Sequence, residues 1–481
     1  MNNRTYCNPL ALPDYPRGKY CRDKENKTYG WLNNGARRDF RETADPSVLY
    51  YENKWYLYPS AGMVWVSEDF CSWEHIQMNL EDVGYAPTIM LHQDAFYLTA
   101  SDREHPCLYR ADTPLGPWIN CGAIVDEQGR TPPAFWDPMY FSDDDGSVYL
   151  YWGCGGAGIY GMQMDPAAPQ KAVTAPEILF SYNPAHVWER YGCHNEDPSR
   201  SWVEGPWMFK HGHTYYLTYC APATQLSSYA MGVYVSDHPM GPFRYAEHNP
   251  FLRDPHGLVQ GPGHGCLVKG PSHTIWAFYT CLVCYHHIFE RRIGMDPVGF
   301  DGDGQLVCFG ASEWPQWAPG MKADPLREGD TGWLPLCARK ITRVSSEAEG
   351  HVSSYAVDGS MRTWWQAGRE DREPWLQVDL GAPFKVQALR ICWVEPGLDY
   401  EHGVLPGPFQ YKVLIQSSLD GAWVLLLDRT GNKDDLLIDY QELAPTEVRA
   451  VKLCMVGWPP GMGLGVIDFQ LFGTGVTGAA G

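Results

Sequence analysis

Three acidic side chains in the first half of the chain lie in short motifs that share one form. Asp45 lies in Ala-Asp-Pro-Ser, Asp137 in Trp-Asp-Pro-Met and Glu204 in Val-Glu-Gly-Pro, each just before an apolar run. Carboxyl groups with different pKa values in one cavity are a usual means of general acid–base catalysis. Three carboxylates around a cavity are costly unless they are solvated, paired or used, so their convergence would indicate an active site.

These motifs belong to one repeated pattern, in which an anchor residue begins an apolar strand, a polar turn follows and an aromatic strand returns. Five copies are visible, with anchors at Asp45, Ala86, Asp137, Glu204 and His264. Each anchor precedes a returning aromatic residue by 11 or 12 positions, and successive anchors are 41, 51, 67 and 60 residues apart. Repeats of this length, made of short strands, are typical of β-propeller blades. Because the first strand of each blade lines the central axis, the anchors are predicted to face one cavity.

The residue pattern of the rest of the chain also predicts an all-β protein, because helical periodicity is nearly absent and short predicted strands alternate with turns. We expect a five-bladed β-propeller over residues 1–312, with 1–40 covering the first blade. A Pro/Trp-rich connector over 313–335 is expected to lie against a domain. Residues 336–475 have strand patterns of a β-sandwich.

Composition restricts the partners and the compartment. A net charge of −20 argues against a nucleic-acid or anionic-membrane partner and fits a neutral substrate. The first residues form no apolar signal segment, and the 15 cysteines lack framework spacing, so we expect a cytoplasmic protein with reduced thiols. Secretion stays open if a signal segment has been removed. The isolated Cys281-Leu-Val-Cys284 is interpreted as buried thiols, because a zinc site would need a second pair.

The order of the motifs resembles glycoside hydrolase family 43. The resemblance rests on Asp-Pro-Ser, Trp-Asp-Pro with Asp-Asp-Asp-Gly-Ser-Val-Tyr-Leu, Val-Glu-Gly-Pro-Trp and Gly-Pro-Gly-His-Gly, in that order across residues 5–310. It implies a five-bladed propeller enzyme that hydrolyses arabinofuranosides, xylosides or related sugars with inversion. By motif, Asp45 would be the general base and Glu204 the general acid, while Asp137 would tune the pKa of the acid and hold it in place.

The same resemblance implies substrate and metal contacts. Arg291 lies where an arginine often contacts the sugar, and the neighbouring Arg292 is the alternative. Tyr85 stands where many members have Trp, which changes the sugar pocket, and Trp136 of the Trp-Asp-Pro motif is a further substrate-binding candidate. His264 matches a histidine near a calcium or water site in the axial channel. The chemistry would need no cofactor, and structural calcium is a possibility in the channel and in the C-terminal domain.

The C-terminal segment resembles the discoidin, or factor V/VIII C-type, domain, which is the fold of carbohydrate-binding module family 32. The matching phrases include Ala356-Val357-Asp358-Gly359, Thr363-Trp364-Trp365 and Leu471-Phe472-Gly473. These are largely framework residues, so they identify a fold and not a ligand. Trp458-Pro459-Pro460 either lies on a binding loop or staples the domain.

The leading interpretation is an inverting, exo-acting α-L-arabinofuranosidase or β-xylosidase that acts on short oligosaccharides or on plant polysaccharide side chains. A β-galactofuranosidase on the same scaffold is one alternative, and a non-catalytic carbohydrate-binding propeller is another. Inversion requires that the acid and the base stand about 6.5–9.5 Å apart. The loop 182–203 is either a pocket wall or a packed surface excursion, and Asp143, Asp144 and Asp145 are predicted to form a solvated hairpin turn. The sequence predicts no oligomeric state.

Overall fold

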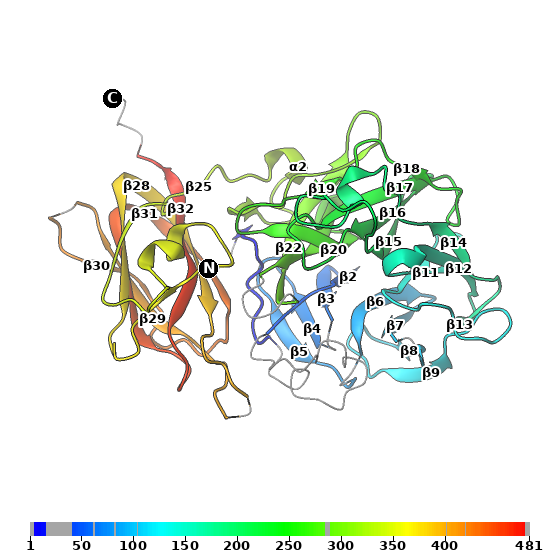
Figure 1. The fold of residues 1–481 in the computed structure, drawn as a ribbon, viewed down its shortest axis with the longest axis horizontal. Coiled ribbons are helices and arrows are strands. Elements are labelled where there is room, and N and C mark those ends of the chain that lie inside the picture. Colours follow the sequence, from blue (N-terminus) through cyan, green and yellow to red (C-terminus); the bar gives the residue numbers. More distant parts are fainter. Residues whose placement is uncertain are drawn as a thin grey trace.

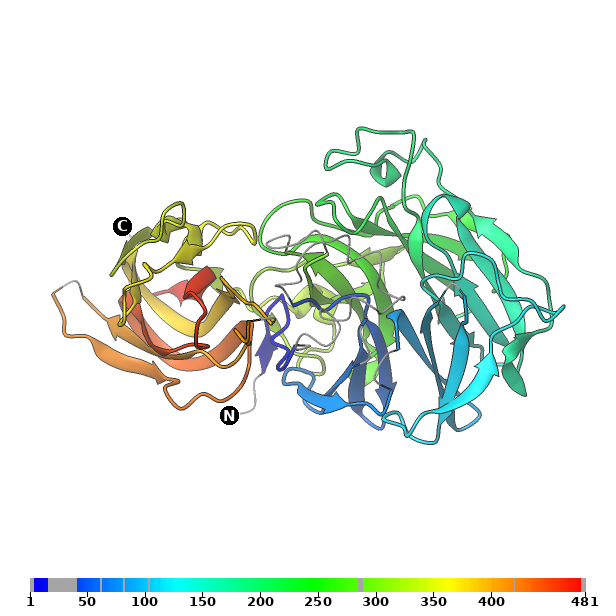
Figure 2. The same ribbon diagram turned by 60° about the horizontal axis from the view of Figure 1, so that its bottom comes forward.

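Two β-rich bodies lie side by side in the computed structural model (Figures 1 and 2). The structure describes residues 4–15, 41–60, 63–80, 83–102, 104–283, 289–400, 402–418 and 420–476. Most of the stretch expected to cover the first blade, and also Cys284, lie outside these residues. The all-β fold expected from the sequence is confirmed, and the helical elements are single turns such as α2 (Pro325–Glu328). None of the helices in the described residues is long and apolar enough to cross a membrane.

Five antiparallel sheets form the larger body, and each is built from strands that are consecutive in sequence. The first two sheets contain β2 (Ser47–Tyr51), β3 (Lys54–Tyr58), β4 (Met63–Ser67) and β5 (Glu74–Gln77), and then β6 (Tyr85–His92), β7 (Ala95–Ser101), β8 (Cys107–Ala111) and β9 (Ile119–Ala123). The third contains β10 (Met139–Ser142), β11 (Val148–Trp152), β12 (Ile159–Asp165), β13 (Ala168–Ala172) and β14 (Glu177–Phe180). The fourth contains β15 (Glu204–His211), β16 (Thr214–Ala221), β17 (Ala230–Ser236), β18 (Arg244–Tyr245) and β19 (Leu252–Arg253), and the fifth β20 (Gln260–Lys269), β21 (Ile275–Leu282), β22 (Arg291–Phe300) and β23 (Leu306–Cys308).

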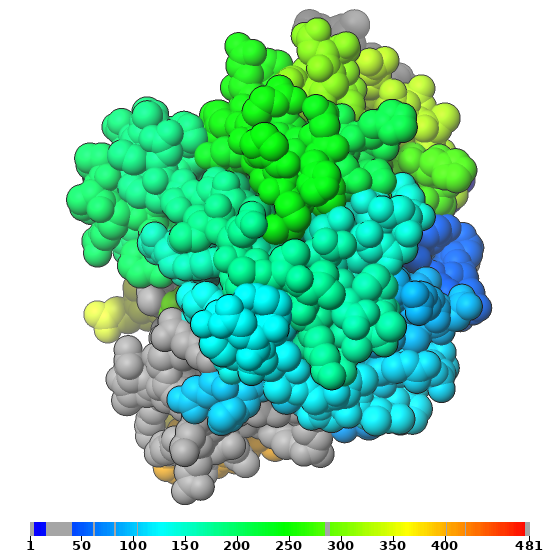
Figure 3. Space-filling view, turned by 90° about the vertical axis from the view of Figure 1, so that its right-hand side faces the viewer, coloured from blue at the N-terminus to red at the C-terminus, as the bar shows by residue number. Residues whose placement is uncertain are grey.

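The sheets close into a ring through their first strands. β2 contacts β6, β6 contacts β10, β10 contacts β15, β15 contacts β20, and β20 returns to β2. This closed order confirms the five-bladed propeller. Apolar and aromatic side chains fill the spaces between neighbouring sheets, and Trp55, Trp65 and Trp276 pack into one cluster between the first and fifth blades. The face away from the smaller body is built from cyan and green blades in Figure 3.

Strand pairing corrects one anchor of the repeat. The residue four positions after the anchor pairs with the returning aromatic residue in the first blade, where Leu49 faces Tyr56. In the fourth blade Phe209 faces Tyr216, so the equivalent anchor is Gly205 and Glu204 lies one residue earlier. Backbone angles agree, because the five equivalent residues have a positive φ: Asp45 (53°), Ala86 (48°), Asp137 (52°), Gly205 (60°) and His264 (38°). Non-glycine residues rarely adopt this left-handed conformation, so its recurrence marks the turn into the axis.

The smaller body is an eight-stranded, antiparallel arrangement whose two longest strands take part in several pairings. Its strands are β25 (Leu334–Pro335), β26 (Ile341–Val344), β27 (Trp365–Gln366), β28 (Trp375–Val394), β29 (Gln410–Gln416), β30 (Val424–Asp428), β31 (Ile438–Gly457) and β32 (Gly465–Gly475). A buried apolar cluster that includes Trp365, Trp393 and Phe469 fills it. This is the discoidin-like β-sandwich expected from the sequence, and we call it the C-terminal domain.

The two bodies are joined by buried contacts. The N-terminal segment, dark blue in Figures 1 and 2, runs between them, and its strand β1 (Thr5–Tyr6) pairs with β24 (Gln316–Trp317) of the connector. Arg390 of the C-terminal domain donates hydrogen bonds to the carbonyl oxygens of Asn8 and Glu313 (2.6 and 2.7 Å). The connector therefore lies against both bodies.

Candidate active site

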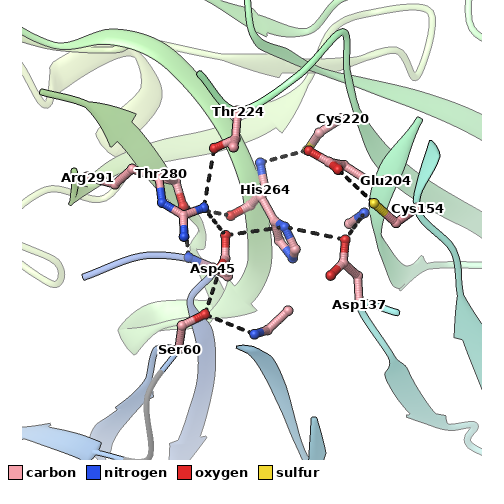
Figure 4. Close-up of polar contacts among 12 residues, drawn as sticks. Asp45, Ser60, Asp137, Cys154, Glu204, Cys220, Thr224, His264, Thr280 and Arg291 are labelled. Carbon is pink, nitrogen blue, oxygen red and sulfur yellow. Dashed lines mark hydrogen bonds and ion pairs between the residues drawn. The ribbon is translucent and has the colours of Figure 1, made fainter. Parts of the chain in front are cut away.

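A cavity of about 420 Å³ opens where the first strands of the blades meet. All five blades contribute to its wall, together with loops between their strands. The lining residues are Asp45, Tyr85, Trp136, Asp137, Cys154, Trp202, Glu204, Ala223, Thr224, Gln225, His264, Phe289 and Arg291. The three acidic residues from different motifs therefore come together in one pocket, and Figure 4 shows their side chains around His264.

Asp45 is held as a carboxylate by donors from three directions. Its Oδ1 accepts a hydrogen bond from Nη1 of Arg291 (3.0 Å), and its Oδ2 accepts one from Oγ of Ser60 (2.6 Å). Burial by itself would raise the pKa of Asp45, but the charges of Arg291 and His264 and these hydrogen bonds outweigh it, so the pKa lies below its usual value. An ionised, oriented carboxylate is what a general base requires.

Asp137 lies on the other side of His264. Its Oδ2 accepts a hydrogen bond from the backbone N–H of Gly205 (3.3 Å), and Oγ of Ser101 donates to its Oδ1 (3.4 Å). Burial, followed by the negative charges of Glu204 and Asp45, raises the pKa of Asp137 to about 7. This carboxyl group therefore takes part in holding a proton close to neutral pH.

Glu204 lies beside Asp137 in the wall of the cavity. Its Oε1 accepts a hydrogen bond from the hydroxyl of Tyr229 (2.7 Å), and its Oε2 accepts one from the thiol of Cys154 (3.1 Å). Burial raises the pKa of Glu204, although these two donors and His264 offset part of the increase. Ligand atoms of Glu204, Asp137 and Cys154 lie within 4.8 Å of one another, so the two carboxyl groups titrate as a pair.

His264 bridges the two aspartates. Its Nδ1 lies 3.3 Å from Oδ1 of Asp45 and 3.8 Å from Oδ2 of Asp137. The sequence predicted a metal contact for this residue. Within the described residues, the group with metal-ligand spacing is Asp137, Cys154 and Glu204, and it does not include His264. A thiol is a soft ligand that suits calcium poorly, so this donor set does not fit the expected calcium ion.

The predicted acidic turn differs from the expectation in one residue. Asp143 is buried, and its carboxylate binds Nζ of Lys210 and the hydroxyl of Tyr215 (both 2.5 Å). Asp144 and Asp145 are exposed, as a solvated turn requires. Asp143 was wrongly grouped with them because a neighbouring blade, distant in sequence, supplies its partners.

The candidate substrate-binding residues separate into two groups. Tyr85, Trp136 and Arg291 line the cavity, whereas Arg292 does not. Side chains alternate along a strand, so Arg292 points away from its neighbour and donates to the carbonyl oxygen of Arg41 (2.8 Å). Tyr85 donates its hydroxyl hydrogen to Glu42, and the guanidinium group of Arg291 lies 5.8 Å from the centre of its ring.

Several cavity residues were missed by sequence reasoning. Trp202, the penultimate residue of the loop 182–203, lines the cavity and is 39% exposed, so one end of this loop forms part of the pocket wall. Its middle is packed: Glu189 is buried and accepts a hydrogen bond from Tyr219 (2.5 Å). Cys154 lies two residues after the aromatic strand β11 of the third repeat, and that position close to the axis was the available signal.

A second cavity, of about 810 Å³, lies among loops of the C-terminal domain. Trp458 is in its wall, and its indole N–H also donates to the carbonyl oxygen of Met462 (3.0 Å). Trp458 therefore staples its loop and lines a cavity at the same time. Both roles left open by the sequence are compatible with this position.

Comparisons with known proteins agree with the geometry. The family described as "Glycosyl hydrolases family 43" matches residues 41–306, and "F5/8 type C domain" matches residues 340–468. A protein named beta-xylosidase from Xylanibacter ruminicola is 26% identical over 329 residues, which cover 55% of this chain and 95% of that protein. An arabinoxylan arabinofuranohydrolase from Paenibacillus polymyxa is 32% identical over 172 residues, which cover 32% of this chain and 25% of that protein.

A solved structure supports the fold. A thermostable family-43 glycoside hydrolase superposes with a TM-score of 0.51 at 22% identity, covering 66% of this chain and all of that one. Since the family-43 match spans more than half of the sequence and contains the five blades and the acidic cavity, the chain belongs to glycosyl hydrolases family 43.

Proposed function

We propose that this protein is an inverting, exo-acting glycosidase that releases arabinofuranose or xylose from oligosaccharides or from polysaccharide side chains. One observation carries the proposal: Asp45 and Glu204 line one cavity and have pKa values shifted in opposite directions. Two carboxyl groups whose surroundings separate their pKa values are the signature of an acid and a base.

The two groups divide the reaction between them. Glu204, whose pKa is raised by burial, donates its proton to the glycosidic oxygen as the bond from that oxygen to the anomeric carbon breaks. Asp45 accepts a proton from a water molecule, whose oxygen attacks the anomeric carbon from the opposite face. The product sugar has the inverted configuration, and the enzyme ends with Asp45 protonated and Glu204 ionised. Exchange with solvent restores both.

Asp137 and His264 support this pair. Asp137 lies within reach of Glu204, and its negative charge, when present, opposes ionisation of the acid. His264 lies between Asp45 and Asp137 and contacts both through the same ring nitrogen, Nδ1. The steps described use protein side chains and a water molecule, and they need no cofactor.

The size of the cavity supports exo action on a small sugar. A volume of about 420 Å³ is near the lower end of small-molecule pockets, which span roughly 300–1,000 Å³. Aromatic side chains of Tyr85, Trp136 and Trp202 stand in its wall and offer faces for a sugar ring. Two of the relatives are named for xylose or arabinofuranose release, which narrows the sugar class to pentoses.

The proposal is tested with nitrophenyl glycosides of arabinofuranose, xylose and galactofuranose. The wild type should cleave one of the pentosides fastest, while Asp45→Ala and Glu204→Ala should lose about a thousandfold or more in kcat. Asp126→Ala is the matched control, because Asp126 is a buried acid that is not among the cavity-lining residues. Proton NMR of the first product should show the inverted anomer. Full activity of both Asp45→Ala and Glu204→Ala would contradict the mechanism. Faster cleavage of the galactofuranoside than of either pentoside would contradict the proposed substrate class.

A further inference from the structure

A buried arginine connects the C-terminal domain to the segment that carries Asp45. Arg41 is 1% exposed, and its guanidinium group makes paired hydrogen bonds to two carboxylates of the C-terminal domain. Nε and Nη2 donate to Glu395 (2.9 and 2.7 Å), and Nη1 and Nη2 donate to Asp435 (both 2.9 Å). These partners are 354 and 394 residues away in sequence. Two-pronged contacts of this kind fix both position and orientation.

Only three residues separate Arg41 from Asp45, and the segment between them is bonded to the cavity wall. Arg41 accepts a hydrogen bond at its carbonyl oxygen from Arg292 (2.8 Å), and the N–H of Thr43 donates to the carbonyl oxygen of Arg291 (3.1 Å). Glu42 accepts hydrogen bonds from Nε of Arg291 (3.0 Å) and from Tyr85. The same Arg291 donates to Asp45. The position of the segment 41–45 therefore determines how Arg291 and Asp45 meet.

We propose that Arg41, Glu395 and Asp435 form an interdomain clamp, through which the C-terminal domain positions the candidate general base Asp45. The clamp residues do not line the cavity and act through the segment 41–45 and Arg291. They are positioning residues. This inference rests on the proposed role of Asp45, and it assigns the C-terminal domain a part in catalysis that is independent of any ligand of its own.

A second buried arginine at the same interface provides a matched comparison. Arg390 forms an ion pair with Asp468 (3.0 Å), and both side chains are as buried as those of the clamp. Arg390 contacts Asn8 and Glu313, which lie outside the segment 41–45. Asp468→Asn leaves the buried Arg390 without its partner charge, and Asp435→Asn leaves the buried Arg41 with one of its two partner charges, so both changes destabilise the fold. Only the change at the clamp should alter the position of the candidate general base, Asp45.

The test compares Asp435→Asn and Glu395→Gln with Asp468→Asn in the full chain, well below the melting temperature of each variant. We expect the clamp variants to lose about tenfold or more in kcat, because small displacements of a reacting group are costly, and Asp468→Asn to stay within about twofold. If Asp435→Asn does not fold, Arg41→Lys keeps the charge and loses the two-pronged contacts. Equal losses at the two arginines, or wild-type kcat in the clamp variants, would overturn the proposal.

The pH profile is the readout that a purely structural role would not change. Asp45 is faced by Arg291 and His264 and also by the acidic groups of Glu42, Asp137 and Glu204. If the loss of the clamp loosens the contact between Arg291 and Asp45, the pKa of Asp45 rises. The acid limb of kcat/KM then moves to higher pH in the clamp variants alone. An unmoved acid limb contradicts the clamp. Full activity of Asp45→Ala would instead remove the proposed function, so the two failures are distinguishable.

Discussion

The backbone N–H of Gly205 donates a hydrogen bond to Oδ2 of Asp137. The equivalent anchor N–H in other blades has a different acceptor. Elsewhere the anchor N–H donates to a side chain at the end of a neighbouring blade's second strand, as Asp45 does to Thr280 and Ala86 to Ser60. In the third blade that position is Gly153, whose N–H pairs with the carbonyl oxygen of Trp136 and which has no side chain to offer. The N–H of Gly205 is therefore directed at the carboxylate.

Gly205→Ala should reduce activity more than stability alone explains. An added Cβ would lie 3.0 Å from the ring of His264, which bridges Asp45 and Asp137. Gly212→Ala is the control, because Gly212 has the same φ of +60° and nothing within 4 Å of its Cβ. Both changes should cost roughly 1–2 kcal/mol of unfolding free energy. Only Gly205→Ala should also lower kcat, by about tenfold to a hundredfold; equal kcat in both variants would contradict this role.

The pH dependence of activity should be bell-shaped, and Asp137→Asn should narrow it. The acid limb reports Asp45, whose pKa lies below the usual value, and the basic limb reports the pair of Asp137 and Glu204, in which the pKa of Asp137 is about 7. Replacing Asp137 by a neutral amide removes the charge that opposes ionisation of Glu204. The basic limb of kcat/KM should therefore move to lower pH, with a lower maximum. A basic limb at the wild-type pH would show that the two carboxyl groups are not coupled.

The same variant should be more stable than the wild type at alkaline pH. The folded-state pKa of Asp137 is raised to about 7, so between its unfolded value and pH 7 the folded state binds more protons than the unfolded state. Stability from this group is thus present at low pH and is lost as pH rises through this range. We expect Asp137→Asn to raise the melting temperature at pH 8 by roughly 2–4 °C and to leave it nearly unchanged at pH 4. Calorimetry at the two pH values checks the sign.

Cys154→Ala should move the basic limb in the opposite direction. The thiol donates to Oε2 of Glu204 and so favours its ionised form. Without this donor the pKa of Glu204 rises, and kcat/KM should persist to higher pH. Cys121→Ala, a partly exposed cysteine of β9 outside the cavity, should leave the profile unchanged. A profile unchanged in both variants would show that the thiol does not affect the acid.

Trp202→Ala should weaken substrate binding and leave chemistry nearly intact. Trp202 is 39% exposed in the cavity wall, whereas Trp314 is 37% exposed and does not line it. Loss of an aromatic face should raise KM up to about tenfold with kcat within a few-fold. Trp314→Ala, which removes the same side chain at similar exposure, should change neither constant. A fall in kcat at constant KM would assign Trp202 to the chemical step instead.

The local repeat made much of the propeller predictable. Each repeat begins with an Asp-Pro, Ala-Pro or Gly-Pro phrase, followed by a strand, a turn and an aromatic strand. This pattern involves only residues close in sequence, so its spacing is visible without coordinates. The convergence of Asp45, Asp137 and Glu204 followed from blade equivalence. The one-residue offset between Glu204 and the anchor Gly205 could not be predicted in this way, because a tripeptide motif does not reveal which residue takes the left-handed conformation.

The partners of the site residues depend on contacts between distant segments. Arg291 and Arg292 are adjacent in sequence and equally charged, and only the direction of strand β22 decides that Arg291 faces the cavity. Cys154 and Tyr229 become partners of Glu204 because three strand ends meet at the axis.

The sequence by itself determined the all-β class, the five repeats and the acidic residues that the repeats bring to one axis, since each of these is written in short-range patterns of residue type and spacing. Only the tertiary structure decided the pKa shifts and the link from Glu395 and Asp435 through Arg41 to Asp45. The physical reason is that burial and the distance between charges are properties of packed chain segments, and residues hundreds of positions apart set both of them here.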